Sequence, residues 1–256
     1  MSTKTHIARP SASVCYNKPH NIKVSGIHKI LVLADAHVPF SDNNFVKKAI
    51  DIGKFFKPDI IVFLGDIIDC VSISRFVKRM DERDFSNEIK ATRKFLEYVC
   101  YNTFRGCDFY YLEGNHEQRI SNFLLTHADA LATLEELSLP SLLHFKELGI
   151  KFLPSDKILQ IGKLTYTHGH LLKGTCSQYP SRSLYLAAKT NAIMGHAHRA
   201  GAYTCRSITG EIFKTFSVGC MSVLSPSYSA FNDFTAGCAI VETDKNNNFE
   251  VQLKSF

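Results

Sequence analysis

Buried and amphipathic segments alternate along the first half of the chain. Short, largely apolar runs end on polar residues at 29–37, 59–66 and 108–115, which is typical of strands buried on both faces. Between these runs, residues 43–56 and 84–103 carry apolar side chains at helical spacing, and Ser41 or Asp42 is a candidate N-cap for the first. The order of strand, helix, strand, helix and strand predicts βαβ units and a parallel sheet.

The second half of the chain has a different pattern. From residue 147 onward, short strand-like segments follow one another closely, and one helix-like segment at 181–190 interrupts them. This pattern predicts a second, mixed sheet. We therefore expect an α/β fold in which two mixed β-sheets pack together with helices outside. Residues 1–26 are predicted to be a polar N-terminal arm, and residues 27–256 a single domain.

Composition narrows the class of protein. Hydrophobic residues make up 45% of the chain, which is enough for a sizeable core, and no apolar run approaches the roughly 20 residues of a membrane helix. The N-terminal segment has no hydrophobic h-region, so we expect no secretory signal, and the 8 cysteines form no C-x-x-C pair. We expect a cytoplasmic protein with reduced thiols and no membrane partner. The net charge of +6 favours anionic partners only weakly.

Chemically active residues gather where the predicted strands end. Five motif segments follow five strands: 35–37 (DAH), 65–69 (GDIID), 114–117 (GNHE), 167–170 (THGH) and 195–198 (GHAH). They contain six of the 11 histidines. In open α/β sheets, ligands bind at the carboxyl ends of the strands. Any one segment alone could be a turn or a solvated loop, but all five in sequence predict a site.

The side chains in these segments favour a metal site. Carboxylate and amide oxygens with imidazole nitrogens suit Mn, Fe or Zn better than Ca or Mg. The set is too large for one tetrahedral zinc ion and suits two ions about 3.5–4 Å apart. Asp66 is the carboxylate best placed between two such ions. Gly65, Gly114, Gly169 and Gly195 are expected to let the backbone turn sharply beside them.

The ordered motif segments resemble the calcineurin-like metallophosphoesterase family, in particular its compact bacterial and phage members, over residues 29–243. The resemblance implies an αββα sandwich and two divalent metal ions, with Mn favoured and Fe, Zn and Ni as alternatives. It implies that a metal-activated water hydrolyses a phosphate ester. The implied metal ligands are Asp35, His37 and His198 for one ion, Asn115, His168 and His196 for the other, and Asp66 between them.

The same resemblance assigns roles outside the ligand set. His116 would protonate the leaving oxygen, and Asp69 would hydrogen-bond His116 and keep it charged. His170, Arg119 and Arg199 are candidate substrate-binding residues, although an arginine after a motif is more often a solvated surface residue.

One departure from the family pattern bears on the substrate. Phosphoprotein phosphatases of the family carry a phosphate-gripping arginine directly after the second motif, where this chain has Cys70. We therefore expect a phosphodiesterase or nuclease acting on nucleotides or nucleic acid. The basic groups at 75–80 and 90–95 could guide nucleic acid, or could be the solvated face of a helix. A phosphomonoesterase is an alternative, as is a non-catalytic binding module, which the complete motifs argue against. The sequence leaves the oligomeric state open.

Overall fold

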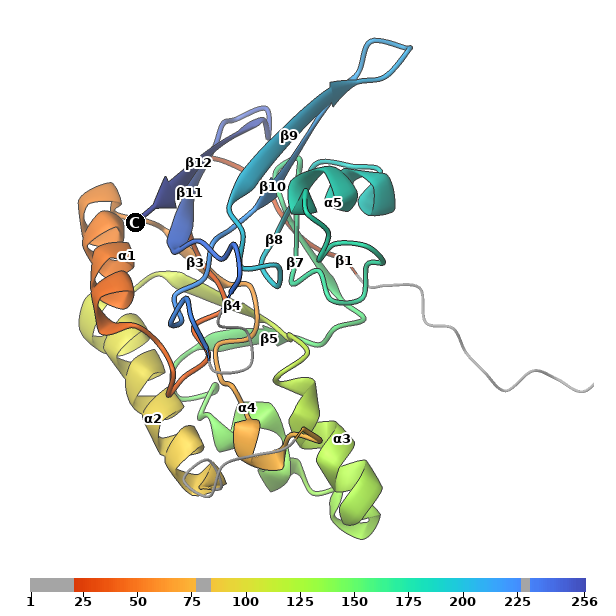
Figure 1. Cartoon of the computed structure of the whole chain (residues 1–256). Helices are drawn as coiled ribbons and strands as arrows, with labels where there is room; N and C mark the ends of the chain where they lie inside the picture. The colour runs from red at the N-terminus through yellow and green to blue at the C-terminus, as the bar shows by residue number, and fades with distance from the viewer. Residues whose placement is uncertain (1–20, 77–83, 227–230) are drawn as a thin grey trace, which may run out of the picture.

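Two six-stranded sheets packed face to face form the centre of the computed structural model, which describes residues 21–76, 84–226 and 231–256 (Figure 1). The first sheet has the order β1 (Asn21–Val24), β6 (Ile158–Ile161), β7 (Leu164–Thr167), β8 (Ala192–Met194), β10 (Ile212–Ser217) and β9 (Gly201–Arg206). The second has the order β12 (Phe249–Ser255), β11 (Gly237–Thr243), β2 (His28–Leu33), β3 (Ile60–Phe63), β4 (Asp108–Leu112) and β5 (Ile150–Leu153). Strands β2 to β5 are parallel and β11 is antiparallel to β2, while β7 and β8 are parallel and β9 is antiparallel to β10. Both sheets are therefore mixed, as predicted.

Helices cover the outer faces of the two sheets. The helical segments are α1 (Asn43–Phe56), the 3₁₀ helix η1 (Val71–Ile73), α2 (Phe85–Glu97) with its π-helical continuation η3 (Tyr98–Thr103), α3 (Gln118–His127), the 3₁₀ helices η4 (Asp129–Leu131) and η5 (Glu135–Leu137), α4 (Leu139–Leu142) and α5 (Pro180–Ala188). Helix α1 has the predicted bounds because the Asp42 side chain accepts hydrogen bonds from the Asn44 and Phe45 amides and starts the first turn. Helix α5 closely matches the predicted helix at 181–190.

The alternation of side chains along each central strand divides the core into layers. In β2, Leu31 and Leu33 belong to the core beneath α1 and α2, whereas Ile30 and Val32 face the other sheet and pack with residues such as Tyr166. On the far side, Leu184 of α5 packs against Ala192 and Met194 of β8. The result is a four-layer arrangement of helices, sheet, sheet and helix.

The N-terminal boundary differs from the prediction. Residues Asn21–Val24, which we expected within a polar arm, form β1 and pair in parallel with β6. The strand is held because Val24 packs on the core between the sheets and the Gly26 amide donates to Asn247 Oδ1. Residues 1–20 of the predicted arm lie outside the described residues.

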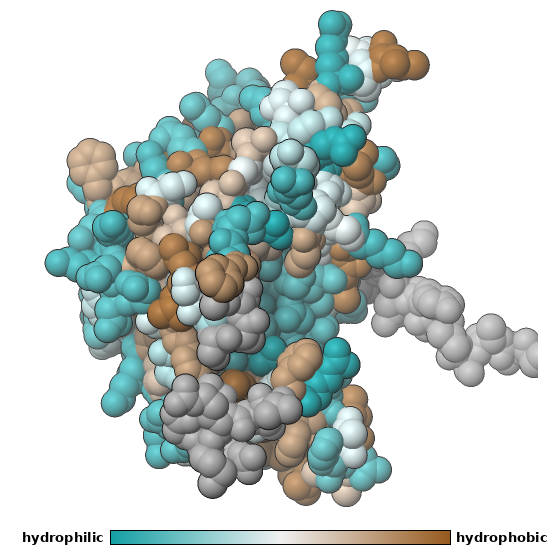
Figure 2. Space-filling model, viewed as in Figure 1, coloured by the Kyte–Doolittle hydropathy of each residue, from teal (hydrophilic) through white to brown (hydrophobic). Residues whose placement is uncertain are grey.

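The face of the described chain shown in Figure 2 carries hydrophilic and hydrophobic residues side by side. The β9–β10 hairpin extends from the body, and hydrophobic residues gather at its tip, where Ile208 is fully exposed (Figures 1 and 2). The seven cysteines in the described ranges are all free thiols. Among the helices of those same ranges, none is long and apolar enough to cross a membrane.

Candidate metal centre

The carboxyl ends of strands from both sheets meet at one place. Strands β2, β3 and β4 of one sheet and β7 and β8 of the other each lead into one of the five motif segments. The structure brings the predicted ligand atoms together in two groups, within 4.8 Å of one another in each: Asp35, His37 and His198, and Asp66, His168 and His196. A third group, of His37, Asp66 and His116, overlaps both. Asn115, the remaining predicted ligand, joins the second group through Oδ1, 3.2 Å from His168 Nε2.

Asp66 lies between the two groups. Its Oδ2 is 3.3 Å from His168 Nε2 and 3.9 Å from His37 Nε2. Asp66 Oδ2 is also 3.8 Å from His116 Nε2. By distance alone, His116 could therefore bind the same ion as Asp66 and His37. A carboxylate in this position could be shared by two ions.

Hydrogen bonds at Nδ1 orient two of the histidines toward the centre. His37 Nδ1 lies 3.0 Å from Asp69 Oδ2, and His168 Nδ1 lies 2.7 Å from the Leu64 carbonyl. Each contact requires a proton on Nδ1, so the atom that each ring can offer to a metal ion is Nε2, which is directed into the centre. There, His37 Nε2 is 3.1 Å from His198 Nε2. A metal ion that displaced the protons between these closely spaced N and O atoms would be held by them, and the mix of atoms fits Mn, Fe or Zn.

The carboxylates and histidines of the metal-free centre shift one another's pKa values. Burial opposes charge on Asp66, but the surrounding histidines, His168 first, hold its pKa well below its usual value. Burial also opposes charge on His168, but Asp66 raises its pKa to about 9. Burial and the nearby His168 lower the pKa of His196 to about 4. Without a metal ion, the charge of Asp66 is therefore balanced by protonated His168, and a bound ion would take the place of that proton.

The backbone that carries these ligands is unusual. Asp35, His37, Asp66, His196 and His198 all have φ angles between 48° and 64°, in the left-handed region that L-residues seldom adopt. Strain of this kind clusters at functional sites. Close packing adds to it, because a Cβ at Gly195 would lie 2.6 Å from Asp35 Oδ2. Gly65 and Gly169 have positive φ as expected, but Gly195 and Gly114 are required by close approach instead.

Glu117 is a structural member of the site that we did not predict. Its buried carboxylate accepts hydrogen bonds from the amides of Asp66 (2.8 Å), Ile67 (2.9 Å) and Gly114 (2.9 Å) and from the Tyr111 hydroxyl (2.6 Å). Burial and the Asp66 charge raise the pKa of Glu117 to about 7. The side chain thus fixes the strained turn that presents Asp66. The only sequence signal for this role of Glu117 was its place at the end of the GNHE segment.

His116, Asp69 and Arg119 form a hydrogen-bonded group beside the centre. His116 Nδ1 is 2.8 Å from the Asp69 carbonyl oxygen and 3.5 Å from its Oδ2. The Asp69 carboxylate makes its closer contact with His37, so it orients a predicted ligand as well as the predicted acid. Arg119 donates from Nη1 to the Asp69 carbonyl at 2.9 Å, and its Nη2 lies 3.0 Å from His116 Nε2. Burial lowers the pKa of His116, but Asp66 and Asp69 outweigh it and raise that pKa overall.

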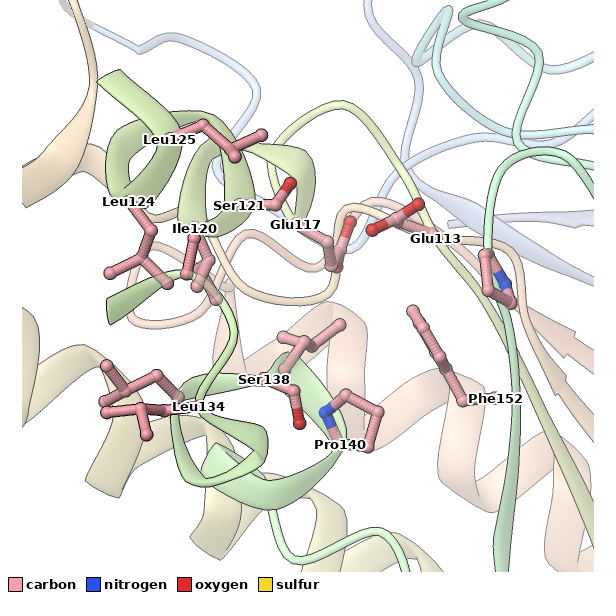
Figure 3. A pocket seen from close by; sticks show the side chains of 14 residues that line it. Glu113, Glu117, Ile120, Ser121, Leu124, Leu125, Leu134, Ser138, Pro140 and Phe152 are labelled. Atoms are coloured by element: carbon pink, nitrogen blue, oxygen red, sulfur yellow. The ribbon is translucent and has the colours of Figure 1, made fainter. Parts of the chain in front are cut away.

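Two hollows adjoin the site. An apolar cavity of about 310 Å³ lies behind Glu117, lined by α3 leucines and by Glu113 and Phe152 (Figure 3). A larger groove of about 810 Å³ runs between the segment after η1 and one side of α3, and Asn115 and Arg119 lie at its inner end.

The remaining candidate residues have different surroundings. The ring of His170 lies 5.2 Å from that of His168, and both of its ring nitrogens are buried without a hydrogen-bond partner. Arg199 bonds Asp233 Oδ2 at 3.1 Å and the Cys176 carbonyl at 3.0 Å, so it ties two loops together. Arg93 of the second basic group donates to the Leu142 carbonyl at 2.6 Å. Of the first basic group, residues 77–80 lie outside the described residues.

Comparison with known proteins gives sequence matches and structural likenesses. Residues 28–214 match the model of the calcineurin-like phosphoesterase family. The chain is 32% identical over 184 residues to the Gene 54 protein of Mycobacterium phage L5, covering 68% of this chain and 70% of that one. Solved structures similar to it include the phosphoesterase Yfce from E. coli (14% identity, TM-score 0.41, 88% and 98% of the two chains). The nuclease MPE of Pseudomonas putida is another (10% identity, TM-score 0.39, 89% and 87%). The span matched by the family model contains all five motif segments.

Proposed function

Because the chain belongs to the calcineurin-like phosphoesterase family, we propose that it is a dinuclear metal-dependent phosphodiesterase or nuclease acting on nucleotides or nucleic acid. Family membership supports a phosphoric ester hydrolase. The observation that carries the finer proposal is the convergence of imidazole nitrogens with carboxylate and amide oxygens from five strand ends around Asp66.

The proposed ligands divide into two sets. Asp35, His37 and His198 would hold one divalent ion, and Asn115, His168 and His196 the other, with Asp66 shared. When bound, such ions would supply the positive charge that activates a water and offsets charge on the phosphoryl oxygens. Mn is the ion we favour, with Fe, Zn and Ni as alternatives.

The chain's own side chains supply the remaining chemistry. In its charged form, which the raised pKa favours, His116 carries one proton on Nδ1, held by the Asp69 carbonyl. A second proton on Nε2, which faces the centre, would pass to the leaving oxygen. Asp69 keeps this histidine and His37 in their orientations. Arg119 binds the same carbonyl and approaches Nε2, so it can offer charge to a phosphate oxygen held there.

The surroundings of Cys70 support a diester over a phosphoprotein. Its side chain is fully buried in the core beneath α1 and α2. The position that carries a phosphate-gripping arginine in phosphoprotein phosphatases of the family is therefore used here for packing. Without an arginine at this position, the site lacks the guanidinium that would bind the phosphate of a dianionic monoester through two hydrogen bonds.

A substrate panel tests the proposal. The protein is loaded with Mn²⁺ and assayed on small aryl diesters, aryl monoesters, cyclic nucleotides, single- and double-stranded DNA and a phosphoprotein. We expect diester hydrolysis at least equal to monoester hydrolysis, loss of activity on exhaustive chelation and recovery with Mn²⁺. Activity that survives chelation, or a phosphoprotein turned over far faster than any diester, would contradict it.

A further inference from the structure

The groove between the segment after η1 and α3 is chemically unlike the apolar cavity behind Glu117. Its described lining includes two arginines, Arg75 and Arg119, and no acidic residue. Amide and hydroxyl side chains, such as that of Gln118, also line the groove. A lining of this kind attracts anions and offers hydrogen bonds along its length.

Aromatic faces also line the groove. Phe123 and His127, one turn apart on α3, stack with ring centroids 4.7 Å apart and an interplanar angle of 13°. Phe76 on the other wall is 63% exposed, and the Arg75 guanidinium lies 5.3 Å from its ring centroid. Exposed rings interleaved with guanidinium groups form the kind of surface on which unpaired bases stack, since every base presents a π face.

The groove reaches the centre on the side of the proposed acid. Asn115 and Arg119 line its inner end, and Arg119 Nη2 is 3.0 Å from His116 Nε2. Because His116 would protonate the leaving oxygen, the part of a substrate that lies in this groove is the leaving part. The volume of about 810 Å³ is that of a small-ligand site and takes one or a few unstacked nucleotides, not a duplex.

We infer that this groove binds the leaving side of a single-stranded polynucleotide, with bases on Phe76 and on the Phe123–His127 stack and phosphates near Arg75 and Arg119. The inference rests on the proposed function, and it narrows the substrate from phosphodiesters in general to unpaired nucleic acid.

Binding without turnover tests the groove separately from catalysis. A fluorescent oligothymidylate of about ten nucleotides is titrated with protein in chelator, followed by anisotropy, beside a duplex of equal length. Phe76→Ala and Phe123→Leu should each weaken binding of the single strand by at least about fivefold. Arg75→Gln should lower the slope of log Kd against log salt by about 0.7, the value for one phosphate contact on a single strand.

Matched controls come from elsewhere on the surface. Phe55→Ala removes a ring that is 91% exposed on α1, and Arg105→Gln removes an exposed arginine after η3. Neither residue lines the groove. Both controls should leave the affinity, the salt slope and the hydrolysis of a small aryl diester as in the wild type.

The outcomes separate this inference from the function on which it rests. With Mn²⁺, kcat/KM of Phe76→Ala should fall at least fivefold more for the oligonucleotide than for the small aryl diester. If the wild type cleaves the aryl diester but prefers the duplex, or if Phe76→Ala binds the single strand like Phe55→Ala, the groove inference is overturned and the phosphodiesterase stands. If groove-dependent binding is present but no ester is hydrolysed, the groove is supported and the proposed activity is wrong.

Discussion

Replacing Glu117 by glutamine should weaken both the fold and the metal centre, although it changes only one oxygen to an amide nitrogen. One carboxylate oxygen accepts from the Asp66 and Gly114 amides, and the other from the Ile67 and Ile68 amides and the Tyr111 hydroxyl. The amide nitrogen is best placed in the second position, because the hydroxyl can rotate to accept. Even there, the N–H groups of Ile67 and, at a longer 3.4 Å, Ile68 lose this acceptor.

The size of the effect follows from that count. A buried donor without a partner costs about 1–3 kcal/mol, and the longer Ile68 bond and weaker bonds to a neutral oxygen add to the Ile67 loss. We therefore expect a loss of about 3 kcal/mol in the free energy of unfolding. For a chain of this length, Tm should fall by about 5–10 °C. Because the lost bonds hold the strained turn at Asp66, Mn²⁺ affinity should fall about 10- to 100-fold. Thermal unfolding without metal measures the first effect, and calorimetric titration with Mn²⁺ measures the second. Both are done near pH 8, where Glu117, with its pKa of about 7, is ionised.

Glu113→Gln is the matched control. Glu113 lines the same cavity (Figure 3), but its Oε2 accepts only from the Ser155 amide (3.0 Å) and hydroxyl (2.7 Å). The amide oxygen can take over both bonds, so a change within about 0.5 kcal/mol is expected. Equal losses of Tm in the two variants, or unchanged Mn²⁺ affinity in Glu117→Gln, would refute the role assigned to Glu117.

Three further substitutions probe the centre. His116→Asn should keep both metals and lower kcat by about 10²- to 10⁴-fold, with a smaller loss for nitrophenyl esters, whose leaving group needs no proton; release of metal, or equal losses for good and poor leaving groups, would make it a ligand or a positioning residue. Asp69→Asn should lower kcat less than His116→Asn does and should also weaken Mn²⁺ binding, because the Asp69 carboxylate orients His37 at 3.0 Å. An unchanged Mn²⁺ affinity would show that Asp69 acts only through His116. Gly195→Ala places a Cβ 2.6 Å from Asp35 Oδ2, so metal content should fall, and a fully loaded variant would show that the loop can adjust.

The fold was predictable where periodicity and local signals agreed. Residues 43–56 have helical spacing and a capping aspartate, and the helix occupies those residues. The segment 118–127 was not predicted as a helix, because it follows a motif directly and no side chain caps its first turn. Strand β1 was missed because four residues at a sheet edge, among polar neighbours, carry little pattern of their own.

The composition of the site was more predictable than its geometry. Strand-ending Asp, Asn and His residues pointed to one sheet edge, and the structure brings them together there. The left-handed backbone of Asp35 and Asp66 could not be read from the sequence, because tertiary packing imposes it. Nor could the nearer partner of Asp69 be foreseen, since His37 and His116 lie with their ring centroids 4.4 Å apart and compete for the same carboxylate.

Metal stoichiometry tests the two-ion centre most directly. Calorimetric titration of metal-free protein with Mn²⁺, checked by elemental analysis of the loaded protein, should give about two equivalents for the wild type. Asp66→Ala should lose both, because the carboxylate lies between the two groups, whereas Asp244→Ala, on the exposed turn between β11 and β12, should retain both. One equivalent or none in the wild type, or two in Asp66→Ala, would contradict a centre built on a shared Asp66.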